Sequence, residues 1–132
     1  MRPPPTLRAP GCRAPALLLF LALAGCGGGS PPRPADPDAA REALQTALDA
    51  WQRGDSPASL QGRRPPIHVV DHDWGAGLRL ARFELGADTP SGADRWCPVR
   101  LWFPDRRGKA VPRTAAYRVG THPALTVVRE DQ

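Results

Sequence analysis

The chain has 132 residues, with 18 Lys and Arg against 13 Asp and Glu, for a formal net charge of +5. This length fits one domain and excludes an α/β barrel or a two-domain dinucleotide-binding enzyme. A hydrophobic content of 41% excludes a chain that is disordered throughout, and three cysteines cannot form a closed set of disulfides. The positive charge alone is typical of a nucleic-acid-binding protein, but it is unevenly distributed along the chain.

The first 25 residues have the pattern of a secretory signal peptide. They carry three Arg and no acidic residue, and an apolar run covers residues 14–24. A positive region before an apolar stretch of about 7–15 residues is typical of export signals. As a helix the run would extend roughly 16 Å, which is too short for a bilayer core of about 30 Å. We therefore predict a signal peptide over residues 1–25, with a buried core helix as the alternative.

The apolar run ends in the sequence Leu23-Ala24-Gly25-Cys26, which resembles the lipobox of bacterial lipoproteins. The resemblance implies that Cys26 is acylated on its sulfur and becomes the first residue of the mature chain. Two or more acyl chains anchor a protein stably in a membrane, whereas one holds it only marginally. The implied partner is membrane lipid, reached through Cys26. The implied location is the cell envelope, with the outer membrane favoured because Gly27 rather than Asp follows the cysteine.

A second cleavage site overlaps the first. Ala22-Leu23-Ala24 satisfies the A-x-A rule for ordinary signal cleavage, and a cut between Ala24 and Gly25 would release a soluble secreted protein. Either cut removes three basic residues and no acidic one, which leaves 15 basic against 13 acidic residues. The mature chain is then close to +2, and we expect no nucleic-acid partner.

Residues 26–35 contain the candidate lipidated cysteine and a Gly/Ser/Pro-rich stretch that has no apolar periodicity. Such a composition predicts a flexible tether. The remaining residues, 36–132, are predicted to form a single small domain.

This domain begins with a well-marked helix of about 16 residues. Asp36 is a good N-cap, Pro37 suits the first helical position, and Gly54 is a suitable terminator after Arg53. Apolar residues repeat at intervals of three and four positions, which predicts one buried stripe. The members of that stripe are Ala40, Leu44, Ala47, Leu48 and Trp51.

Strand composition follows the helix. The segments with β-branched or alternating sequence are residues 67–71, 78–85, 96–103, 111–119 and 124–129. The segments between them are predicted to be a loop with a short helical turn at 56–66, polar turns at 71–75 and 87–94, and a hairpin turn at 105–109. One helix followed by strands predicts an α+β fold, with the helix packed on a curved antiparallel sheet of about four to five strands.

The segment order and the helix exit Trp51-Gln52-Arg53-Gly54-Asp55 are similar to those of small NTF2-like and cystatin-like domains. Our leading hypothesis is a non-catalytic binding or structural module without a cofactor. The alternative that the resemblance implies is a hydrolase or isomerase with a pocket between helix and sheet. Tyr117 and His68 are its candidate residues.

The densest set of metal-ligand types is the segment His68 to Asp73. His68 and His72 would share a face only on a helix, whereas on a strand they lie about 13 Å apart. We therefore predict a strand end and no metal site. The alternative is that His72 and Asp73 bind a metal ion together with a distant residue such as His122.

Trp96, Arg100 and Trp102 share one face of a predicted strand, opposite Cys97, which is predicted to be buried. Aromatic rings that alternate with Arg can bind a ligand, so these three residues are the candidate ligand surface, for an envelope protein or a polysaccharide. The alternative is that Arg side chains stack on the rings and cover the sheet. Basic residues in the turns at 63–64 and 106–109 can contact anionic lipid or polysaccharide, or can simply be solvated.

Overall fold

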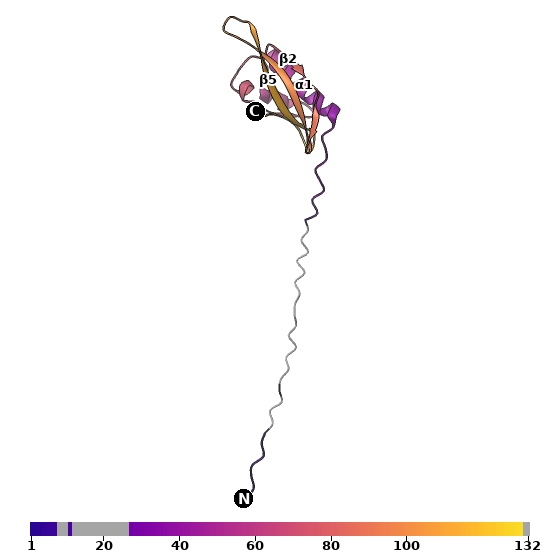
Figure 1. Cartoon of the computed structure of the whole chain (residues 1–132), viewed down its shortest axis with the longest axis vertical. Helices are drawn as coiled ribbons and strands as arrows, with labels where there is room; N and C mark the ends of the chain where they lie inside the picture. Colours follow the sequence, from indigo (N-terminus) through magenta and orange to yellow (C-terminus); the bar gives the residue numbers. More distant parts are fainter. Residues whose placement is uncertain (8–10, 12–26, 131–132) are drawn as a thin grey trace. The chain divides into compact units, whose positions relative to one another are not determined.

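A computed structural model describes residues 1–7, 11 and 27–130 (Figure 1). In chain order, the elements are helix α1 (Pro37–Arg53), 3-10 helix η1 (Pro57–Gly62), strand β1 (Ile67–Val70), helix α2 (His72–Gly75), and strands β2 (Arg82–Leu85), β3 (Thr89–Ser91), β4 (Asp94–Pro104), β5 (Ala110–Gly120) and β6 (Leu125–Glu130). This is the predicted α+β fold. In the described part of the chain, no helix has the length and apolar character needed to cross a membrane.

Helix α1 forms where the sequence predicts it. The Asp36 side chain accepts a hydrogen bond from the Ala39 N–H at 2.7 Å, which caps the first turn. Gly54 ends the helix with φ of 88°, a left-handed conformation that glycine adopts without strain. The predicted apolar stripe is buried, including Trp51.

The six-stranded sheet has the order β1-β6-β5-β4-β2, and β3 also pairs with β4. Strands β4, β5 and β6 form the predicted antiparallel meander. The predicted antiparallel sheet is confirmed except at one edge, where β1 pairs in parallel with β6, and it has six strands rather than about four to five. A parallel pair needs a long crossover, and the whole segment from α2 to β5 supplies it.

Three local predictions also need correction. The strand predicted over residues 78–85 is regular only in β2, because the Leu78 and Ala81 carbonyls accept hydrogen bonds from the α1 side chains of Trp51 and Gln52. The polar turn predicted at 87–94 contains β3. The polar turn predicted at 71–75 contains the single-turn helix α2.

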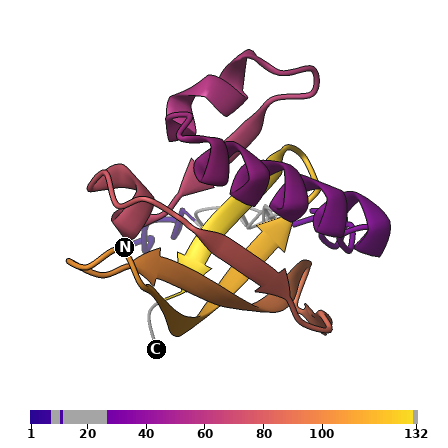
Figure 2. The ribbon, with the colours of Figure 1, turned by 90° about the horizontal axis from the view of Figure 1, so that it is seen from above.

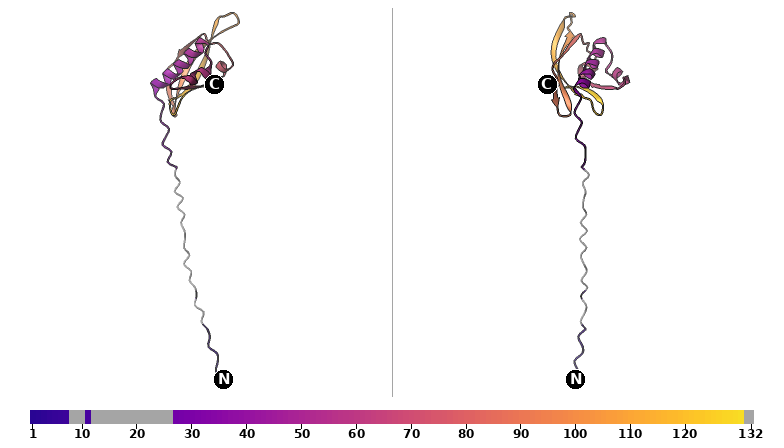
Figure 3. Two further views of the ribbon diagram at one scale, coloured as in Figure 1. Left: turned by 180° about the vertical axis from the view of Figure 1, so that it is seen from behind. Right: turned by 90° about the vertical axis from the view of Figure 1, so that its right-hand side faces the viewer.

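Helix α1 lies across one face of the curved sheet, here called the inner face (Figure 2; Figure 3, right). The Trp51 ring stacks on Trp74 with centroids 5.5 Å apart and packs against Phe103 at 5.6 Å. The Trp51 and Trp74 indole N–H groups donate to the carbonyls of Leu78 and Asp55. The other face of the sheet, the outer face, carries no helix among the described residues.

Candidate functional site

The predicted lipidation site, Cys26, and its cleavage motif of Leu23, Ala24 and Gly25 lie outside the described residues. Residues 27–34, which follow directly, are exposed and form no regular element. At roughly 3.3–3.6 Å per residue, eight residues can extend to about 28 Å. A segment of this length can hold a folded domain away from a bilayer surface.

The chain joins the domain at one defined point. Ala35 is buried, and its N–H donates to the Ala93 carbonyl at 2.8 Å. The next N–H, of Asp36, donates to the Thr121 hydroxyl at 3.0 Å. The start of the domain is therefore held between the turn before β4 and the turn after β5.

The candidate ligand residues Trp96, Arg100 and Trp102 all lie on the outer face of β4. The guanidinium carbon of Arg82 is 3.9 Å from the Trp102 ring centroid, and that of Arg100 is 5.8 Å from it. This is cation–π geometry. The stacking that the sequence offered as an alternative is therefore present at Trp102.

A hollow lies beside Arg100 on the sheet. Its volume is about 440 Å³, within the usual range of roughly 300–1,000 Å³ for small-ligand sites. Glu84, Arg100 and Thr114 supply its polar groups. Gly86 allows the close approach of Pro98 there, since an added Cβ would lie 2.8 Å from the Pro98 ring.

A second cavity, of about 240 Å³, lies between α1 and the edge formed by β1 and β6. Ala43, Ile67 and Leu125 give it apolar walls, and Glu42 and Arg64 are charged residues in its lining. The sequence analysis did not identify this cavity, because its walls come from segments about 80 residues apart.

The inner face carries a buried polar cluster, which we call the Asp71 cluster: Asp71, Tyr117, Arg129 and Asp73. The Tyr117 hydroxyl donates to Asp71 Oδ2 at 2.6 Å, and Arg129 donates to the same oxygen at 3.3 Å and to Asp73 Oδ2 at 3.4 Å. The other Asp71 oxygen accepts the Trp74 N–H at 3.0 Å and caps α2.

Burial, and then the neighbouring Asp71 carboxylate, raise the pKa of the Tyr117 hydroxyl well above its usual range. A tyrosine in this state holds its proton and acts as a hydrogen-bond donor. No buried side-chain nitrogen or oxygen of the described residues lacks a partner. Such mutual hydrogen bonding of buried groups is typical of a structural network.

This cluster is not predicted by any sequence motif. The sequence pattern predicts a polar turn at Asp71 and a strand at Arg129, without a link between them. A signal was present, because Leu125, Val127 and Arg129 alternate toward the inner face, and a charge at a buried position requires a partner. Which carboxylate pairs with Arg129 depends on the parallel placement of β1 beside β6, which the sequence pattern does not encode.

The structure does not bring the other candidate residues together. His68 lies on the outer face of β1, whereas Tyr117 lies on the inner face of β5, and β6 separates the two strands. His72 lies in α2, where its Nε2 is 3.5 Å from an oxygen of Asp73. Across residues 27–130, no three or more His, Cys, Asp or Glu side chains are grouped to hold a metal ion.

Cys97 is buried on the inner face of β4, as predicted. Burial, with a smaller contribution from Asp88, raises the pKa of its thiol to about 11. A thiol in this state is protonated at neutral pH and is a poor nucleophile.

Comparisons with protein-family models, with curated proteins and with solved structures find no match to this chain. A functional conclusion therefore depends on the chemistry of these sites rather than on fold.

Proposed function

We propose that this protein is a membrane-anchored lipoprotein of the bacterial cell envelope, whose α+β domain is a non-catalytic binding or structural module. The observation that carries the proposal is the sequence Leu23-Ala24-Gly25-Cys26 at the end of a short apolar run. The acylated partner is membrane lipid, and the outer membrane is the favoured location in a host that has one.

The arrangement of the chain after Cys26 supports this proposal. Residues 27–34 are exposed, and the buried hydrophobic residues of the domain begin at Ala35. The domain thus has its own core, which is what a module attached to a lipid through a tether requires.

Metabolic labelling with an alkyne fatty acid in a bacterial host tests the proposal. We expect label on the wild-type protein and on Cys97→Ala, and none on Cys26→Ser. Sucrose-gradient fractionation should place the labelled protein with outer-membrane markers. An unlabelled wild-type chain in the soluble exported fraction would support the soluble secreted alternative instead.

A second candidate function is a small NTF2-like enzyme with a pocket between helix and sheet. The cavity of about 240 Å³ beside α1 favours it. Neither Tyr117 nor His68 lines this cavity, so an enzyme would have to use Glu42 as its acid or base. A hydrolase or isomerase activity that Glu42→Gln abolishes, with the fold retained, would support the enzyme over the binding module.

A further inference from the structure

The hairpin that joins β4 to β5 extends beyond the core of the domain (Figure 1). Every residue from 104 to 114 is exposed. We call this segment the basic arm. Its charged side chains, apart from one Asp, are all cationic: Arg106, Arg107, Lys109 and Arg113.

The single carboxylate of the basic arm is occupied by the turn. Asp105 Oδ1 accepts the N–H groups of Arg107 and Lys109, each at 2.8 Å. No ion pair joins Arg106, Arg107, Lys109 or Arg113 to a carboxylate in the described part of the chain. The guanidinium carbon of Arg113 lies 5.1 Å from the Phe103 ring centroid, so the charges available to a partner are those of Arg106, Arg107 and Lys109.

The positive charge continues along the outer face. Arg82, which pairs with Trp102 across β2 and β4, and Arg100, two residues before Trp102 on β4, lie next to this ring near the base of the basic arm. The four cations of the arm and these two arginines make six cations, with only two carboxylates among them, those of Asp105 and Glu84. The rest of the mature chain holds nine basic and eleven acidic residues. The net charge of the mature chain is only about +2, but its positive charge is concentrated at the basic arm. The electric field of such a distribution attracts anions to that end of the domain.

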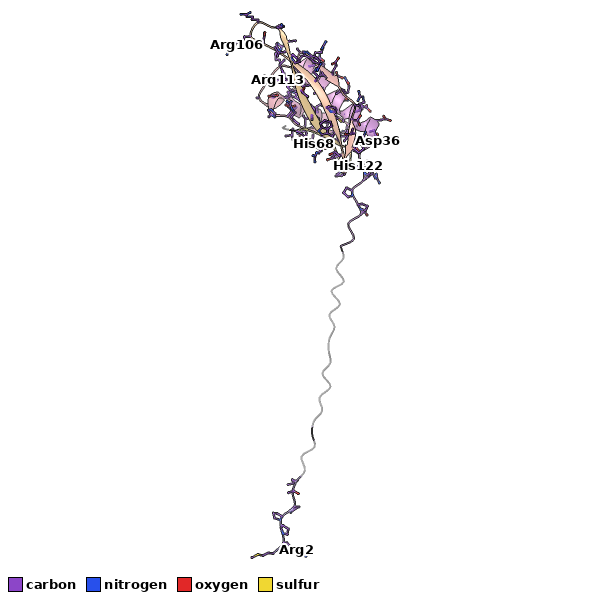
Figure 4. All side chains as sticks on the ribbon, in the orientation of Figure 1. Arg2, Asp36, His68, Arg106, Arg113 and His122 are labelled. Carbon is purple, nitrogen blue, oxygen red and sulfur yellow. The ribbon has the colours of Figure 1, made fainter. Side chains whose placement is uncertain are left out.

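The basic arm lies at the end of the domain opposite the point where the chain enters it at Ala35. The chain joins the domain beside Ala93, just before β4 begins, and β4 then runs 11 residues to the arm. At about 3.4 Å per residue this is roughly 35 Å. Figure 4 shows Asp36 and His122 at one end of the domain and Arg106 and Arg113 toward the other.

We propose that the basic arm binds an acidic polysaccharide of the cell envelope. Cations of the arm would pair with carboxylates or phosphates along the polymer. An anionic bilayer fits less well, because membrane insertion uses large apolar side chains. Val111, 42% exposed, is the exposed large apolar residue of the arm. The location of this binding in the cell envelope rests on the proposed anchoring through Cys26, but the binding itself does not.

Binding of the detergent-solubilised mature protein to immobilised polygalacturonate, with neutral dextran as a reference, tests this inference. The arm variant is Arg106→Gln/Arg107→Gln/Lys109→Gln. Its matched control is Arg33→Gln/Arg53→Gln/Arg79→Gln, which removes the same charge from exposed positions elsewhere. Thermal unfolding of each variant verifies that the fold is retained.

We expect wild-type binding at low salt that weakens strongly at about 1 M salt, where the Debye length is about 3 Å. The arm variant should lose about tenfold or more in affinity, and the control much less. Equal losses in both variants, no binding to polygalacturonate, or a clear preference for vesicles of phosphatidylglycerol and phosphatidylcholine would overturn the inference. Cys26→Ser should bind the polymer as wild type does, so failure of the proposed lipidation and failure of this inference give different results.

Discussion

Arginine side chains have different environments at two places in this domain. In the Asp71 cluster, Arg129 is 10% exposed and lies within hydrogen-bond distance of two carboxylates and a tyrosine hydroxyl. In the basic arm, Arg106 and Arg107 are exposed, and the nearest carboxylate in sequence binds the backbone instead. The comparison indicates that the first arginine stabilises the fold, whereas the other two are available for recognition.

The largest effect that this comparison predicts is on stability. Asp71→Ala leaves Arg129 with Asp73 as its remaining carboxylate partner, leaves the buried Tyr117 hydroxyl without its acceptor, and removes the cap of α2. Breaking a buried ion pair in this way costs about 3–5 kcal/mol. Urea unfolding measures it, with the exposed helical Asp38→Ala as a control that should change stability far less. Equal effects of Asp71→Ala and Asp38→Ala would show that the cluster is not structural.

Tyr117→Phe removes the hydroxyl that donates to Asp71 and accepts from Arg129, and leaves the ring in place. Because the acceptor is a carboxylate, we expect a loss of about 1.5–3 kcal/mol in the free energy of unfolding. The double variant with Asp71→Ala should lose less than the sum of the two single losses. Additive losses would contradict direct coupling between the two residues.

The pH dependence of stability tests the buried region of the comparison through Cys97, which pairs with Tyr117 across β4 and β5. Because burial raises the pKa of this thiol from 9.0 to about 11, the folded state holds the proton more tightly than the unfolded state does. The contribution of this thiol to stability is therefore complete below pH 9 and declines as the pH rises toward 11. Cys97→Ala should show a smaller decline over that range, and an identical decline would contradict this assignment.

The smallest effect is expected at the basic arm. The arm variant Arg106→Gln/Arg107→Gln/Lys109→Gln should change the free energy of unfolding by no more than about 0.5 kcal/mol per substitution, because these side chains are exposed. Urea unfolding at moderate salt measures it. A large destabilisation would show that the arm contributes to the fold and would remove the contrast with the Asp71 cluster.

The local structure of α1 is predictable because the signals for it are local. The Asp36 cap, the apolar stripe and Gly54 all lie within the helix or next to it. The position of β1 is not predictable in this way, since its parallel pairing with β6 joins segments almost 60 residues apart. The Asp71 cluster depends on that pairing, so alternation alone could show that Arg129 faces inward but not which carboxylate it meets.

The outer face also combines features that the sequence predicts with features that it does not. Strand alternation correctly places Trp96, Arg100 and Trp102 on one face. The contact between Arg82 and Trp102 requires the register of β2 against β4, which the irregular residues 78–81 obscure; the Leu78 and Ala81 carbonyls bond α1 side chains, while the Ala81 N–H bonds the Trp102 carbonyl. The free charges of the arm likewise become apparent only once Asp105 is seen to bind the turn.

The intact mass of the mature protein, purified from bacterial membranes, tests the central claim most directly. Lipidation predicts a chain that begins at Cys26 and carries the added mass of its acyl groups. A chain that begins at Gly25 without acyl mass, with Cys26 as a thiol, would contradict the claim and would support the soluble secreted form.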